Sequence, residues 1–153
     1  FFSVQPPPRS SRAAMADHAE MELLHPPLDG VTCVRFAPTA DRLAVSSWDK
    51  GVRAYNVQPN SNCLIGDYQH EAAVLDCCWA SDNTIYSGGL DKNVMSYSLD
   101  TRQAQQLGAH DGPVRAVCHN PSAQALFSGS WDQSVKQWDP RCPRPQTHLI
   151  QLP

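Results

Sequence analysis

The sequence predicts an all-β protein that is built from repeated units. The clearest unit contains SGSWDQSVKQWD, from Ser128 to Asp139, and weaker copies are SSWDKGVRAYN (46–56) and SGGLDKNVMSYS (87–98). An aspartate recurs at the same place in each copy, at intervals of 42 and 41 residues: Asp49, Asp91 and Asp132. A fixed period of this length indicates a stack of equivalent structural units.

Each unit is expected to contain four short strands. Apolar and polar residues alternate in VTCVRF (31–36), VRAYNV (52–57) and VKQWD (135–139), which favours strands over helices. The fourth strands are less regular and are expected at CLIGDY, AQQLG and THLIQL. The predicted units cover residues 28–69, 70–109 and 110–152.

The polar residues that recur in the units favour one fold. A leading histidine and a trailing Trp-Asp at a period near 41 are typical of WD40 β-propellers. The fold class is therefore all-β, a partial WD40 propeller of three blades within residues 15–153. The segment EMELLH (20–25), which ends at two prolines, is a further strand candidate.

The same polar residues resemble a Ser/His/Asp catalytic set, but we expect them to be structural. In a WD40 blade the aspartate accepts from the histidine, the histidine contacts the serine, and the serine contacts the tryptophan N–H. The set also recurs, whereas an active site is rarely copied from blade to blade, so no catalytic residue is expected. The predicted structural residues are His70, Ser87, Asp91, Tyr97, His110, Ser128, Asp132, Trp138 and, in a unit that lacks the histidine, Asp49.

Composition excludes several other functions. The net charge of −3 provides no global basic field for nucleic acid, and no apolar run approaches the length of a membrane span. The six cysteines form no CxxC pair, so we expect reduced and mostly buried thiols. Neither the histidines nor the cysteines have the spacing of a closed metal site, and we expect no metal and no cofactor.

The residue before each turn aspartate is the best candidate for partner binding. These residues are Trp48, Leu90 and Trp131, and they belong to turns that share one face of a propeller, the top face. Aromatic anchors with Lys50 and Lys92 beside them would form a peptide-docking surface. The alternative is that each tryptophan only packs over its own blade.

Two segments near the ends of the chain carry separate predictions. Phe1 to Ala14 contains three consecutive prolines and precedes the first methionine, Met15, so we expect either non-native upstream sequence or a disordered tail. Trp138 to Arg141 forms a WDxR string. In some WD40 proteins such a string docks a cullin ubiquitin-ligase adaptor, and in many others it only ends a strand.

At the level of whole segments, the chain resembles the spindle-checkpoint WD40 proteins that partner Bub-type kinases. The segments that carry the resemblance are VSSWDKGVRAYNV, YQHEAAVLDCCW, SGGLDKNV and SGSWDQSVKQWDPR, which agree in order and spacing. The sister group, the WD40 factors for mRNA export at the nuclear pore, is similar too. Asp49 and GGLDKNV favour the checkpoint group, while CCW and LIQLP favour the sister.

The resemblance implies a non-enzymatic, seven-bladed adaptor, monomeric at full length, in the nucleus and at kinetochores in mitosis, with a possible cytoplasmic pool. It would bind Bub-type checkpoint kinases and a phosphorylated kinetochore scaffold peptide, with no direct contact to nucleic acid or membrane. Trp48 and Trp131 carry over as top-face residues, and most basic residues that pair with acidic groups would lie in later blades. We expect the chain to be an N-terminal fragment, in which residues 20–25 are the closing strand of the last blade.

Overall fold

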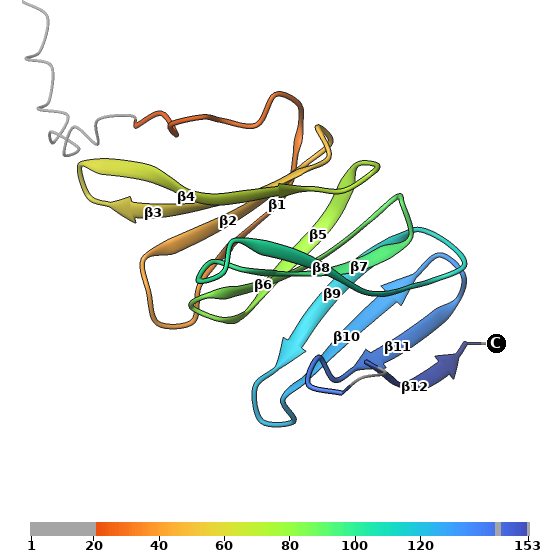
Figure 1. Ribbon diagram of the computed structural model, residues 1–153. Helices are drawn as coiled ribbons and strands as arrows, with labels where there is room; N and C mark the ends of the chain where they lie inside the picture. The colour runs from red at the N-terminus through yellow and green to blue at the C-terminus, as the bar shows by residue number, and fades with distance from the viewer. Residues whose placement is uncertain (1–20, 143–144, 153) are drawn as a thin grey trace, which may run out of the picture.

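Three four-stranded antiparallel sheets lie side by side in the computed structural model, which describes residues 21–142 and 145–152 (Figure 1). Each sheet is a meander of consecutive strands, which confirms the predicted all-β fold and three blades. The strands are β1 (Val31–Phe36), β2 (Arg42–Ser47), β3 (Gly51–Gln58), β4 (Ser61–Gln69), β5 (Val74–Ser81), β6 (Thr84–Gly89), β7 (Asn93–Ser98), β8 (Gln103–Ala109), β9 (Val114–Asn120), β10 (Ala125–Ser130), β11 (Ser134–Trp138) and β12 (Gln146–Gln151).

The turn between the second and third strands has the same construction in each sheet. In the first and third sheets the turn aspartate accepts a hydrogen bond from the backbone N–H two residues later, at 2.9 Å for both Asp49 and Asp132. The residue after the aspartate adopts a positive φ, 71° at Lys50 and 66° at Gln133. A short polar side chain that bonds its own backbone stabilises such a turn.

The core lies between the sheets and not within a single one. One cluster joins the first two sheets and includes Tyr68, Val74 and Trp79. A second cluster joins the second and third sheets and includes Leu107 and Trp138. Because each sheet buries its apolar face against the next, the three blades form one stack.

The first strands of the three sheets, β1, β5 and β9, run beside one another (Figure 1). Side chains tie these strands together across the sheet boundaries. Thr32 Oγ1 donates to the Val74 carbonyl at 2.8 Å, and the Val117 N–H donates to Asp76 Oδ2 at 3.0 Å. These contacts fix the relative position of the three inner strands, which line the site described below.

Residues 21–25, the described part of the segment expected to close the last blade, form no strand here, and since the strands of that blade are not in the described structure the expectation stays a prediction. Asn62 holds the segment by its backbone instead: its amide donates to the Glu22 carbonyl, and its oxygen accepts from the Leu24 N–H, both at 2.8 Å. Tyr55 Oη also donates to the His25 carbonyl. A strand requires a neighbouring strand, and the described chain offers this segment none.

Three further expectations concern the cysteines, residues 1–14 and membrane spans. Only Cys33 and Cys77 are buried, whereas Cys63, Cys118 and Cys142 are exposed, so the prediction of mostly buried thiols is wrong. Of the exposed cysteines, Cys63 lies in β4, Cys118 in β9 and Cys142 in the segment after β11. The segment 1–14 lies outside the described residues. Within the described ranges there is no helix long and apolar enough to cross a membrane.

Candidate functional site

The third sheet contains a continuous chain of hydrogen bonds, the His110 network. His110 Nδ1 lies 3.0 Å from Asp132 Oδ2, and His110 Nε2 lies 2.7 Å from Ser128 Oγ. Trp138 Nε1 donates to the same serine oxygen at 2.7 Å. A neutral histidine satisfies every partner, because Nδ1–H donates to the aspartate and Nε2 accepts from the serine hydroxyl.

The second sheet repeats this arrangement with one correction to the sequence prediction. His70 contacts Asp91 at 2.9 Å and Ser87 at 2.7 Å. The hydroxyl beside Ser87 Oγ, at 2.6 Å, is that of Tyr68 from the first sheet and not that of Tyr97. The hydroxyl of a tyrosine lies at the tip of its ring, farther from the backbone than the N–H of a tryptophan such as Trp138. Tyr97 instead stacks on Tyr68, with ring centroids 4.7 Å apart.

The first sheet stabilises its turn without a histidine. Asp49 forms an ion pair with Arg53 at 2.8 Å, and its Oδ2 accepts from the Leu28 N–H, just as the other two turn aspartates accept from the N–H of the residue after the histidine; Pro27 occupies the histidine position. Val45, which occupies the serine position, is fully buried. This blade therefore depends on an ion pair and on apolar packing.

The ionisation of these residues follows from their surroundings. Burial, only partly offset by Asp132, lowers the pKa of His110. Burial would raise the pKa of Asp132, but hydrogen bonds from Ser134, from the Asp111 N–H and from His110 outweigh it and hold that pKa well below the usual range. The network is thus built for a neutral imidazole beside a carboxylate. The Ser128 hydroxyl donates to His110, accepts from Trp138 and is almost fully buried, which is the arrangement expected of a structural network.

The two turn tryptophans remain largely in solvent. Trp48 is 50% exposed and Trp131 is 60% exposed, and both side chains line a cavity of about 270 Å³ that we call the indole cleft. Their backbones are fixed, since Trp48 N donates to the Gly30 carbonyl and Trp131 N to the Pro113 carbonyl. Leu90 is half-buried and does not line the cleft. The structure thus brings together two of the three predicted top-face residues.

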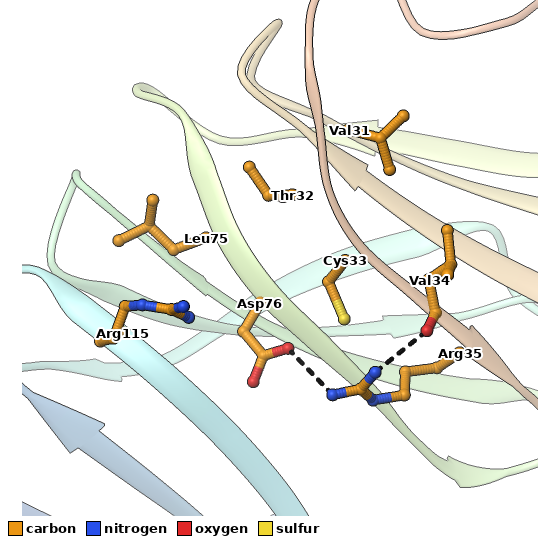
Figure 2. A pocket seen from close by; sticks show the side chains of 8 residues that line it. All are labelled: Val31, Thr32, Cys33, Val34, Arg35, Leu75, Asp76 and Arg115. Carbon is orange, nitrogen blue, oxygen red and sulfur yellow. Dashed lines mark hydrogen bonds and ion pairs between the residues drawn. The ribbon is translucent and has the colours of Figure 1, made fainter.

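A cation that sequence reasoning missed lies in the same place. Arg115 of β9 lines the indole cleft and also an adjoining inner-strand cavity of about 440 Å³. Figure 2 shows it reaching from β9 toward Leu75 and Asp76, with Arg35 on the other side of Asp76. The only signal in the sequence was an arginine at a strand position where the other units have Thr32 and Leu75.

Comparison with known protein families agrees with the fold of three similar sheets. The family model described as "WD domain, G-beta repeat" matches residues 22–56, 61–98 and 101–139, and each match contains the first three strands of one sheet, except for the end of β3. The chain belongs to the WD40 repeat family.

Several WD40 relatives are similar to this chain. The mitotic checkpoint protein BUB3.1 of Arabidopsis thaliana is 45% identical over 80% of the chain, and the mitotic checkpoint protein bub3 of Dictyostelium discoideum is 38% identical over 78%. The poly(A)+ RNA export protein of Schizosaccharomyces pombe is 39% identical over 80%. In each case the match covers 36% of the relative, so the chain spans about a third of their length.

Two other candidate sites are the WDxR string and a metal centre. Arg141 of the WDxR string donates through Nε and Nη2 to the Asp139 carboxylate, each at 2.8 Å, and holds the pKa of Asp139 at about 2. The guanidinium thus closes its own turn, and the ubiquitin-ligase interpretation stays a prediction. Among the described residues, no group of three or more His, Cys, Asp and Glu side chains could hold a metal ion.

Proposed function

We propose that this chain is part of a non-enzymatic WD40 adaptor of the mitotic spindle checkpoint, which binds peptide segments on its top face. The observation that carries the proposal is the indole cleft, where Trp48 and Trp131 from two different blades line one cavity while half or more of each side chain stays exposed. Large exposed aromatic side chains that lie close together are typical of protein-binding sites.

The position of the cleft argues against a purely structural role for the tryptophans. Trp138 shows what a structural tryptophan looks like in this fold, because it is 1% exposed and donates to Ser128. Trp48 and Trp131 are neither buried nor bonded through their indole N–H groups to any described residue. We therefore assign them to partner binding.

The partners we propose are an acidic segment of a Bub-type checkpoint kinase and a phosphorylated Met-Glu-Leu-Thr-type peptide of the kinetochore scaffold. Relatives named as mitotic checkpoint proteins support this assignment, at 45% and 38% identity. We further propose that the full-length protein is a monomeric propeller of seven blades in the nucleus, located at kinetochores in mitosis. Residues 20–25 would then pair with strands of the last blade.

The second candidate is an mRNA-export adaptor at the nuclear pore. Relatives named as a poly(A)+ RNA export protein and as mRNA export factor GLE2, at 39% and 37% identity, favour it. Both candidates would use the same cleft, so the cleft alone does not separate them. The turn aspartate after Trp48 is present in this chain, and we take it to favour the checkpoint role.

A competition experiment with the full-length protein separates the two candidates. Immobilised protein is offered equal amounts of a checkpoint-kinase segment and a nucleoporin segment, and the bound fraction of each is measured. We expect the kinase segment to be retained in preference and to be lost from the Trp48→Ala, Trp131→Ala double variant. Preferential retention of the nucleoporin segment would assign the chain to the export group.

A further inference from the structure

We propose that Arg115 selects the bound peptide, by pairing with an anionic side chain of a peptide whose apolar side chain lies between Trp48 and Trp131. The inference rests on the proposed function and adds a residue and a chemical class to it. It goes beyond the prediction from sequence, in which the basic residues that pair with acidic groups belonged to later blades.

Arg115 lies on the wall that the two cavities share. It is exposed, and it lines both the indole cleft and the inner-strand cavity, together with Val31, Thr32 and Leu75. The cleft, at about 270 Å³, lies just below the usual range of roughly 300–1,000 Å³ for pockets that enclose a whole small molecule. A peptide side chain is therefore a better match for the cleft than a free metabolite.

The third blade does not need an arginine at this position for its own structure. At the equivalent position of the first blade, Thr32 donates to the Val74 carbonyl and ties two sheets together, and the second blade has Leu75. Arg115 forms no ion pair with any residue in the described ranges. Its guanidinium group is thus available to a ligand.

The charge of the cavity walls favours an anionic ligand. Among the described residues that line the two cavities, there are two arginines, Arg35 and Arg115, and one carboxylate, Asp76. Asp76 already accepts from the Val117 N–H, and Arg35 lies 3.9 Å from its other oxygen (Figure 2). The wall therefore keeps an excess of about one positive charge, although the chain as a whole carries −3. An anionic side chain is favoured there and a cationic one is not.

The test is a double-mutant cycle with the full-length protein and synthetic Met-Glu-Leu-Thr peptides. Four peptides are used. The second position is either Glu or Gln, and the threonine is either phosphorylated or not, so that the carboxylate and the phosphate are tested separately. The protein variants are Arg115→Ala, Arg115→Lys and the matched control Arg102→Ala. Arg102 is an exposed arginine in the β7–β8 turn, at the opposite end of the blades.

We expect Arg115→Ala to lower the affinity for the peptides that carry the recognised anion, carboxylate or phosphate, by about tenfold. The affinity for the peptide with Gln and unphosphorylated threonine should change by less than about twofold, and the salt dependence of binding should fall. The form that loses affinity identifies carboxylate or phosphate as the group that Arg115 recognises. Arg115→Lys should recover part of the loss, and Arg102→Ala should have no effect. Equal weakening of charged and neutral peptides, or an equal effect of Arg102→Ala, would overturn the inference.

The Trp48→Ala and Trp131→Ala variants, measured in the same cycle, separate this inference from the proposed function. If the tryptophan variants weaken all four peptides while Arg115→Ala weakens none, the proposed function stands and the role of Arg115 is wrong. If the tryptophan variants bind all peptides normally, the indole cleft is not the site. Failure of the wild-type protein to bind any of the four peptides would overturn both.

Discussion

At the scale of single residues, Ser128 connects His110 and Trp138 in the hydrogen-bond network of the third blade. Its hydroxyl is within hydrogen-bond distance of His110 Nε2 and of Trp138 Nε1, and it is 1% exposed. Each of these groups is buried, so neither can find water in place of the serine. Among the described residues no buried side-chain nitrogen or oxygen lacks a partner, which shows how completely the blades satisfy their polar groups.

Replacement of Ser128 by alanine is expected to destabilise the full-length protein by about 2 kcal/mol or more, because it leaves two buried polar groups without a partner. Urea unfolding of the wild type and the variant measures the loss. Ser122→Ala, at an exposed position, is the control and should change stability by less than about 0.5 kcal/mol. A similar small change for Ser128→Ala would show that the network contributes little.

The protonation of His110 should make stability depend on pH. Burial lowers its pKa in the folded protein below the ordinary 6.5, so the unfolded chain takes up a proton first as pH falls. The stabilisation from this residue is therefore complete above pH 6.5, and is lost as pH falls below 6.5 and through the folded pKa.

Melting temperatures between pH 7.5 and 5.5 measure this effect. The wild type and a variant at the exposed His148, His148→Gln, should lose stability on acidification, while His110→Gln should lose less over the same interval. The comparison uses slopes, so a lower starting melting temperature of His110→Gln does not affect it. Equal slopes for all three proteins would contradict the assignment.

At the scale of strands and sheets, the close approach of neighbouring blades places strict demands on certain positions. A Cβ atom at Gly108 of β8 would overlap the buried ring of Trp138, whereas a Cβ atom at Gly129 of β10 would meet nothing within 4 Å. Neither glycine has a positive φ, so backbone strain does not complicate the comparison.

Gly108→Ala is therefore expected to destabilise the full-length protein by about 1–3 kcal/mol through overpacking, and Gly129→Ala to be neutral or slightly stabilising. Thermal or urea unfolding of the two variants in parallel checks this. A loss of stability of the same size in both would mean that the tight contact between β8 and Trp138 is not as described.

The repeat period predicted the strands, the turns and most of the histidine networks, because these features recur at the same position in every unit. It failed where a contact crosses from one unit to another. Tyr68 belongs to the first sheet yet completes the network of Ser87, so a comparison of equivalent positions pointed to Tyr97 instead. Arg115 was missed for the opposite reason, since it occupies a position where the units differ.

At the scale of the whole molecule, the stack of three blades has two faces with no neighbouring blade in the described structure. On β1, Val34 is 50% exposed and Phe36 is 64% exposed, and on β12, Leu149 and Ile150 are exposed as well. The equivalent residue of Val34 in the third blade, Val117, is buried in the core between two sheets. The faces thus have the character of blade interfaces.

The 153-residue chain by itself is therefore expected to self-associate, because apolar strands and open sheet edges favour pairing. Size-exclusion chromatography with light scattering, at several protein concentrations, should show species larger than a monomer. A monomer with a sharp, cooperative melt would show instead that the two faces are stable in water.

We propose that the exposed indoles bind a partner and do not stabilise the fold. The most direct test is a calorimetric titration of the phosphorylated Met-Glu-Leu-Thr peptide into full-length wild type and into the Trp48→Ala, Trp131→Ala double variant, with a thermal melt of each. We predict that the double variant loses at least about tenfold in affinity while its melting temperature stays within about 2 °C of the wild type. Unchanged affinity, or a loss of affinity that is matched by a large fall in melting temperature, would contradict it.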